Sequence, residues 1–203
     1  DQFSRVISQA VRMLDNVLDA TAWPLEKQRQ EARDKRRIGL GYTGLGDVLI
    51  ALGIRYDSKL GRETAVAITK CMRDTAYRTS VNLAREKGAF PKLDVEEYLN
   101  SGFALRLPED IRDGIKEFGI RNSHLLAIAP TGTISLAFAD NASNGIEPAF
   151  SWSYTRSKRM SDGSKLDYDV EDHAYRLWKS LGHDASNLSE SFVSALDIAA
   201  RDR

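Results

Sequence analysis

The sequence predicts an α/β fold in which helices dominate, and three observations support this prediction. Apolar residues recur at helical spacing over residues 3–20, and a second helical pattern runs from about residue 57 to residue 87. An apolar run over 125–129 and alternating polar and apolar residues over 150–155 are typical of strands. With 203 residues, 42% of them hydrophobic, the chain is long enough to bury a core.

The first predicted helix covers residues 3–20 and carries a single apolar stripe. Trp23 and Pro24 end it and begin a charged segment that runs to Lys35. The stripe consists of Val6, Ile7, Ala10, Val11, Leu14, Val17 and Leu18.

Two more helices are predicted before residue 90. A short one covers 47–53, and Asp57 or Ser58 can cap a long one that runs to about Lys87 and stops at Gly88. The inner face of the long helix carries Ile68, Met72, Ala76, Thr79 and Leu83.

Helices and strands are both expected in the second half of the chain. Asp162 and Gly163 are typical of a turn. The expected elements are helices over 94–100 and 108–118, strands over 125–129 and 150–155, and closing helices over 170–181 and 188–201. Both ends of the chain lie in helical patterns without caps, so we expect residues 1–203 to be one section of a longer chain, truncated at both ends.

Composition excludes several kinds of partner. Lys+Arg and Asp+Glu each number 29, so no net charge attracts nucleic acid or an anionic membrane, and any anion site has to be built locally. The sequence has no run of about 18 apolar residues, so we expect a cytoplasmic protein that binds neither nucleic acid nor membrane. The one cysteine excludes an intramolecular disulfide, and the three histidines fit no zinc-ligand spacing, so no metal site is predicted.

Residues 39–44, GLGYTG, match the dinucleotide fingerprint GxGxxG. That fingerprint requires a buried strand before its first glycine, whereas the charged residues 34–37 stand there. The favoured interpretation is a short strand around 38–41 whose glycines allow another backbone or a ligand to approach closely. Binding of a nucleotide cofactor is the alternative.

Cys71 lies in the middle of the long predicted helix, between Lys70 and Met72. A catalytic thiol needs a base or a lowered pKa in an accessible cleft, and the sequence offers neither here. A packing role is therefore favoured over a catalytic one.

Residues 130–135, PTGTIS, form a predicted strand-to-helix corner that is rich in hydroxyl groups. The first amides of a helix are unpaired, and the helix dipole places about half a positive charge there. Thr131, Thr133 and Ser135 add three hydroxyls, whereas capping a helix needs only one. Phosphate binding and simple helix capping are the two interpretations of this corner.

A polar loop, residues 140–148, follows the corner and leads into the strand at 150–155. Asn144 and Glu147 in this loop are expected beside the same pocket. A surface turn is the alternative, because Asn, Ser and Gly are common in turns.

Four motifs in order resemble the large catalytic subunit of ribonucleotide reductases over nearly the whole chain. The Thr-Gly-Thr-Ile-Ser and Gly-Ile-Glu-Pro pairing, with an aromatic strand after it, most resembles the adenosylcobalamin (vitamin B12)-dependent class. The motifs are RRIGLGYTGLGD at 36–47, RNS at 121–123, APTGTIS at 129–135 and NGIEP at 144–148.

The resemblance implies a section of a ten-stranded α/β barrel in an oxidoreductase that makes deoxyribonucleotides for DNA synthesis. It implies that the corner holds the phosphates of the ribonucleotide substrate, and that part of the polar loop lines the pocket. The phosphate-binding residues would be Pro130, Thr131, Gly132, Thr133, Ile134 and Ser135, and the pocket-lining residues would be Asn144, Gly145, Ile146 and Glu147.

The family's radical chemistry, by the same resemblance, uses a thiyl radical on one cysteine and electrons from two more. This chain has one cysteine, so no residue in it is assigned a catalytic role, and the radical cysteine is expected elsewhere in the reductase. For the intact enzyme the resemblance implies adenosylcobalamin as cofactor and a ribonucleotide as substrate. Its expected partners are the rest of the catalytic chain, a thioredoxin-type reductant and a second copy in a homodimer.

Two alternatives to this interpretation stay open in the sequence. One is the iron-dependent class of the same family, and the other is a non-catalytic helical interaction module that only shares the fold.

Overall fold

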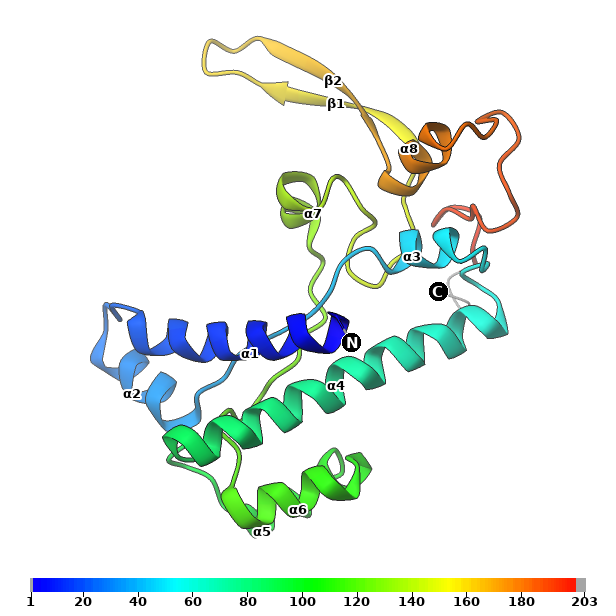
Figure 1. Ribbon diagram of the computed structural model, residues 1–203. Coiled ribbons are helices and arrows are strands. Elements are labelled where there is room, and N and C mark those ends of the chain that lie inside the picture. The colour runs from blue at the N-terminus through cyan, green and yellow to red at the C-terminus, as the bar shows by residue number, and fades with distance from the viewer. Residues whose placement is uncertain (1, 200–203) are drawn as a thin grey trace. The chain divides into compact units, whose positions relative to one another are not determined.

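The computed structural model describes residues 2–199, and Figure 1 shows them as helices with one two-stranded sheet. In chain order the elements are α1 (Gln2–Ala20), α2 (Glu26–Lys35), α3 (Leu45–Ala51), α4 (Lys59–Lys87), α5 (Val95–Leu99), the 3-10 helix η1 (Ala104–Arg106), α6 (Glu109–Phe118), α7 (Gly132–Phe138), β1 (Ser153–Arg159), β2 (Lys165–Glu171) and α8 (His173–Ser180). This confirms the mixed α/β class, although the described residues do not close a barrel. None of the described helices combines the length and apolar character that crossing a bilayer requires.

The chain divides into two compact units. The first comprises Asp1–Leu40 and Ala67–Ala127, and the second comprises Gly41–Val66 and Ile128–Arg203.

The core of the first unit is built on α1, α4 and α6. Apolar residues on one side of each helix are buried, as the helical spacing predicts. Gly114 lets α6 approach α4 closely, because a side chain there would meet Val81 Cγ1 at 3.0 Å. The buried residues include Ile7, Val11, Met72, Ala76, Leu83, Ile111, Ile115, Ile120 and Leu125.

A buried polar network around Asp15 joins α1 to the rest of this unit. Asp15 has no exposed surface, and its Oδ1 accepts hydrogen bonds from Arg36 Nε (2.9 Å) and Nη2 (2.8 Å) and from Asn122 Nδ2 (3.0 Å). Arg121 Nε and Lys87 Nζ both lie 3.3 Å from Oδ2. Burial alone would raise the pKa of Asp15, but the hydrogen bonds and charge of Arg36, with Arg121 and Asn122, hold it below its usual value.

The expected strands at 38–41 and 125–129 form less structure than predicted. The structure has one parallel bridge between Leu40 and Leu126, supported by hydrogen bonds from Leu40 N to Leu125 O (2.8 Å) and from Ala127 N to Leu40 O (3.0 Å). Of the apolar run 125–129, only Leu125 is buried, and Ile128 is 78% exposed. Two extended segments pair too briefly here to make a named strand.

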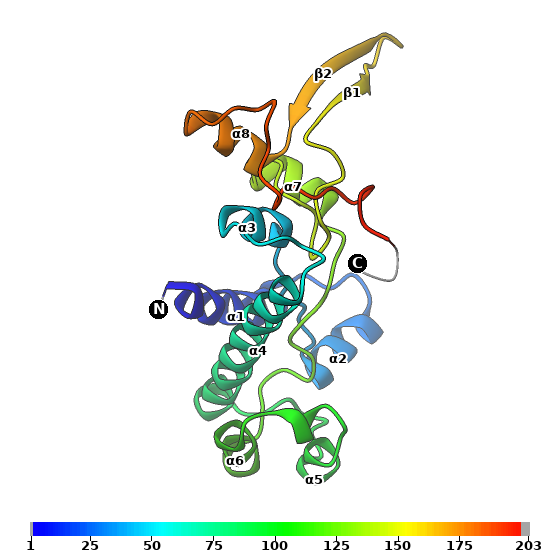
Figure 2. The ribbon, with the colours of Figure 1, turned by 90° about the vertical axis from the view of Figure 1, so that its right-hand side faces the viewer.

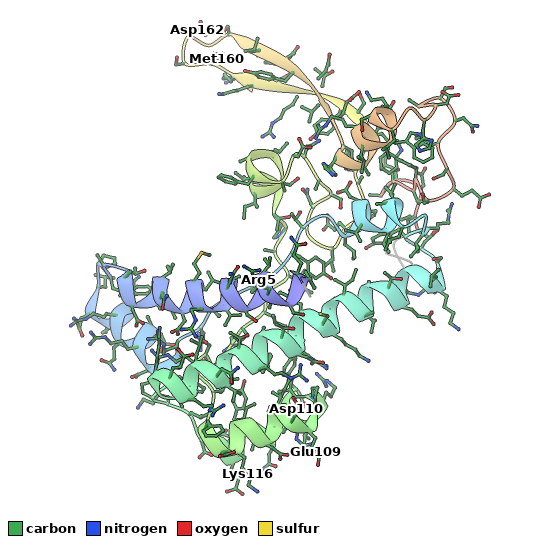
Figure 3. All side chains as sticks on the ribbon, in the orientation of Figure 1. Arg5, Glu109, Asp110, Lys116, Met160 and Asp162 are labelled. Atoms are coloured by element: carbon green, nitrogen blue, oxygen red, sulfur yellow. The ribbon has the colours of Figure 1, made fainter. Side chains whose placement is uncertain are left out.

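The sheet of the second unit is an antiparallel hairpin that runs from Ser153↔Glu171 to Arg159↔Lys165. The predicted turn at Asp162 and Gly163 is confirmed: Gly163 N donates to Met160 O (3.0 Å), and Asp162 Oδ1 accepts from Ser164 N (2.9 Å). Figure 3 labels Met160 and Asp162 at the tip of this hairpin.

The predicted closing helices need correction. Residues 165–171 form β2, and the helix expected over 170–181 begins only at His173, after its cap Asp172. The helix expected over 188–201 is wrong over its described part, since residues 188–199 form turns and irregular segments. Positions 200 and 201 lie outside the described residues. Serines there form local bonds instead, such as Ser194 Oγ to Asp197 Oδ2 (2.6 Å), which compete with a helix.

Candidate functional site

The corner at 130–135 adopts an unusual backbone conformation in the second unit. Thr131 has φ 56°, in the left-handed region that a β-branched residue rarely occupies. The seven-residue helix α7 follows, and its first turn contains no acidic side chain. Strained backbone of this kind is concentrated at functional sites in proteins.

The hydroxyl of Thr131 does not cap α7. Its Oγ1 accepts a hydrogen bond from Gly145 N (2.7 Å) and donates one to Thr43 Oγ1 (3.0 Å). The side chain thus ties the corner to the polar loop and leaves the first-turn amides of Gly132, Thr133 and Ile134 without a partner inside the helix.

The other two hydroxyls of the corner differ from each other in exposure. Ser135 is 1% exposed, and its Oγ donates to Ala142 O. Thr133 is exposed, and a Cβ added to the preceding Gly132 would meet nothing within 4 Å. The sequence suggested three hydroxyl donors, whereas the structure leaves the Thr133 hydroxyl at an open surface beside the unpaired amides.

Ser143 is the point at which the polar loop is held. Its N–H donates to Asp47 Oδ2 (2.6 Å), and its carbonyl accepts from Thr43 Oγ1 (2.6 Å) and Gly44 N (2.9 Å). Gly46 allows this contact, because a side chain there would lie 3.0 Å from Ser143 Oγ. A Cβ on Gly46 would also lie 3.2 Å from Pro148 Cα, so this glycine lets the backbone of the polar loop approach. In the predicted strand, a Cβ on Gly39 would meet the Ala127 side chain at 3.1 Å.

The polar loop also packs directly on the corner. Gly145 has φ 48°, and a Cβ on it would lie 2.6 Å from Ala129 O, so only glycine fits. Tyr56 donates its hydroxyl to Ile146 O (2.7 Å), and burial, followed by the nearby Glu147 charge, raises the pKa of this tyrosine. Of the predicted pocket residues, Asn144, Ile146 and Glu147 are exposed and Gly145 is buried against the corner.

Sequence reasoning missed a pair of buried acids beside the loop. Asp47 lies in the first turn of α3, and Asp172 caps α8, which α3 contacts (Figures 1 and 2). Both carboxyl groups accept a hydrogen bond from the same N–H, that of Ala174, at 3.1 Å to Asp47 Oδ1 and 3.0 Å to Asp172 Oδ1. Burial, followed by the nearby charge of Asp47, raises the pKa of Asp172 to about 8. The only sequence signal was that Asp47 ends the glycine-rich motif.

Cys71 lies in the first unit, on α4, and is half-buried. Its Sγ lies 3.6 Å from Ser4 Oγ on α1. Within residues 2–199, no three histidine, cysteine, aspartate or glutamate side chains are grouped as metal ligands would be.

The chain is similar to known proteins over most of its length. The family described as "Ribonucleotide reductase, barrel domain" matches residues 1–199. The vitamin B12-dependent ribonucleoside-diphosphate reductase of Mycobacterium tuberculosis is 37% identical over 157 residues, which are 77% of this chain and 20% of that protein. The protein of the same name from Thermoplasma acidophilum is 35% identical over 156 residues (77% and 18%), and the ribonucleoside-diphosphate reductase subunit alpha of Helicobacter pylori is 32% identical over 169 residues (74% and 21%). The chain spans about a fifth of the length of these relatives.

Proposed function

Because this chain belongs to the ribonucleotide reductase family and matches its barrel domain, we propose that it is part of a ribonucleoside-diphosphate reductase. The complete enzyme converts ribonucleotides to deoxyribonucleotides by radical chemistry for DNA synthesis. Relatives with this activity in their names cover most of the chain, which favours this function over a non-catalytic helical module.

Within that enzyme, the corner binds the phosphate groups of the ribonucleotide. The observation that carries this proposal is the engagement of the Thr131 hydroxyl by Gly145 and Thr43 rather than by α7. A corner built only to cap the helix would use that hydroxyl on the first-turn amides. Instead, the amides of residues 132–134 and the exposed Thr133 hydroxyl remain for an anion.

The polar loop completes the pocket in this proposal. Gly145 fixes the loop against the corner, and Asn144, Ile146 and Glu147 line the side on which the rest of the nucleotide lies. Pro130 and Ile134 serve as parts of the corner's backbone.

The vitamin B12-dependent class is the proposed class, since several relatives carry that name. The iron-dependent class remains the alternative, because other relatives are named simply as subunit alpha or large chain. The described residues form no site fitted to adenosylcobalamin, so this cofactor is proposed for the complete enzyme, and phosphate binding at the corner does not involve it. A thioredoxin-type reductant, a homodimer and a cytoplasmic location are proposed on the same basis.

The test uses Thr133→Ala in the complete enzyme. Loss of one hydrogen bond to a charged group is worth about 1.5–3 kcal/mol, so substrate should bind about ten- to a hundredfold more weakly, with thermal stability unchanged. Gly132→Val should weaken binding more, because the space around Gly132 is open and the new side chain would block the phosphate rather than the fold.

Two variants serve as controls for the fold and for the surface. Ser135→Ala removes a buried donor to Ala142 O and should lower stability by about 1–3 kcal/mol. Thr155→Ala on the hairpin removes an exposed hydroxyl and should change neither property. The proposal is wrong if Thr133→Ala and Gly132→Val bind substrate as tightly as the parent.

A further inference from the structure

The buried pair Asp47 and Asp172 holds a proton. The two residues are 6% and 4% exposed, and their Oδ1 atoms accept from the same N–H, that of Ala174, at 3.1 and 3.0 Å. Two buried carboxyl groups that share one N–H donor repel each other when both are ionised, which favours the state in which one of them holds a proton.

The hydrogen-bond partners indicate which residue carries the proton. Both oxygens of Asp47 accept N–H groups: Oδ1 from Ala174 N (3.1 Å) and Oδ2 from Ser143 N (2.6 Å). On Asp172, Oδ1 accepts from Ala174 N (3.0 Å) and Tyr175 N (3.4 Å). The second oxygen of Asp172 accepts from no N–H among the described residues, so it is the oxygen of the pair best placed to carry a proton.

The charged groups around the pair are engaged with one another. Asp140, in the polar loop, pairs with His173 and Arg176 of α8, and Glu171, at the end of β2, pairs with Lys179. Among the described residues, neither acid of the buried pair has an ion-pair partner within 4.0 Å. A single proton on the pair would therefore remove one of its two negative charges.

We propose that Asp47 and Asp172 are a one-proton positioning pair for the nucleotide pocket, an inference that rests on the proposed function. Asp47 holds the N–H of Ser143, the residue just before Asn144. The same loop reaches the corner through Gly145 N and Thr131 Oγ1. Asp172 keeps Asp47 in place by donating its proton, and neither acid touches the substrate.

This arrangement is sensitive to alkaline pH. Burial and the neighbouring carboxylate raise the pKa of Asp172 to about 8. A carboxyl whose pKa is raised on folding stabilises the fold at low pH, and this contribution is lost as pH rises through the raised value. Above about pH 8 two buried carboxylates would face each other, and Asp47 would release Ser143.

The test compares Asp172→Asn with Asp47→Asn in the complete reductase chain between about pH 6 and pH 9. Asparagine at 172 keeps an oxygen for the α8 cap and offers Asp47 a permanent N–H donor. Asparagine at 47 has the same size but gives up one of the two accepting oxygens. The measurements are hydrogen exchange at the Ser143 and Gly145 amides without nucleotide, and KM and kcat for the ribonucleotide.

In the parent, the protection factor of the Ser143 amide, which is the intrinsic base-catalysed exchange rate divided by the observed rate, should fall and KM should rise about tenfold per pH unit above the titration, as one linked proton requires, with a smaller change in kcat. Asp172→Asn should flatten both profiles while keeping the neutral-pH values. Asp47→Asn should give fast exchange and a high KM at every pH. If Asp47→Asn does not fold, the pH profiles of the parent and of Asp172→Asn are sufficient to test the inference.

The inference is overturned if Asp172→Asn keeps the parent's pH dependence, or if folded Asp47→Asn protects Ser143 normally. A failure of the phosphate-binding proposal looks different: Thr133→Ala would then bind substrate normally while the exchange results at Ser143 stand. If the pair has only a structural role, the two variants should differ from the parent in stability but show the same pH profile of KM.

Discussion

Removing the Asp15 carboxylate should destabilise the first unit far more than removing a surface ion pair. In Asp15→Ala, Arg36 would remain buried at 5% exposure without its main partner. Breaking a buried charge pair in this way costs about 3–5 kcal/mol. Arg36 would keep Asp19 at 2.8 Å, and Arg121 would keep the carbonyls of Lys87 and Gly88, so we expect the lower end, about 3 kcal/mol.

For a chain of this length, that loss corresponds to a Tm about 6–12 °C lower, measured by circular dichroism or calorimetry at neutral pH. The matched control is Arg78→Ala, which removes the pair with Asp110, whose side chains are 47% and 58% exposed. Exposed pairs contribute about 0.2–1 kcal/mol, so its Tm should fall by no more than about 4 °C.

The effect of Asp15→Ala should also depend on pH. The network lowers the pKa of Asp15, so its contribution is present above the ordinary carboxyl pKa and is lost as pH falls through the lowered value. The difference in stability between parent and variant should therefore be largest at neutral pH and shrink below about pH 4. Equal losses in Asp15→Ala and Arg78→Ala at neutral pH would refute the reasoning.

Three further predictions concern packing and activity. Gly61→Ala should lower the free energy of unfolding in urea by about 1–3 kcal/mol, because the new Cβ would lie 2.6 Å from two backbone carbonyl oxygens. Gly102→Ala, with nothing within 4 Å of the new Cβ, should lower it much less, and equal losses in the two variants would contradict this prediction. Cys71→Ser should cost at most about 1–2 kcal/mol and leave the rate of 3′-hydrogen abstraction in the intact enzyme unchanged, and loss of that chemistry in a folded variant would contradict a packing role. The isolated chain, with one cysteine, should make no deoxyribonucleotide from ribonucleotides, adenosylcobalamin and a dithiol, and turnover above a no-protein control would overturn this.

Local signals in the sequence were enough to predict the main helices. The apolar stripe over 3–20 corresponds to α1, and the expected cap at Ser58 is present as a hydrogen bond from Gly61 N to Ser58 Oγ (2.9 Å) ahead of α4. The pairing of extended segments was harder to predict, because a strand depends on its partner. Residues 165–171 alternate with period two, as β2 requires, but the acidic residues on one face are uncommon in strands and argued against this assignment.

The location of the candidate site could be predicted from the sequence, but its internal connections could not. The hydroxyl-rich stretch identified the corner, yet Thr131 and Ser135 are distinguished only by contacts with the polar loop and with Thr43. The Asp47 and Asp172 pair is invisible to any local pattern, since α3 and α8 bring together residues from distant parts of the chain.

The hydrogen bonds that fix Ser143 have a consequence for the order of folding. The hydrogen bond from Thr43 to Ser143 closes a loop of 100 residues, and the one from Ser143 to Asp47 closes a loop of 96. The bond from Ala174 to Asp47 closes a loop of 127 residues. Contacts between such distant residues form late, because the entropy of loop closure has to be overcome first. During synthesis the glycine-rich segment therefore cannot complete these contacts until α8 has been made. The corner should be among the last parts of the chain to become ordered.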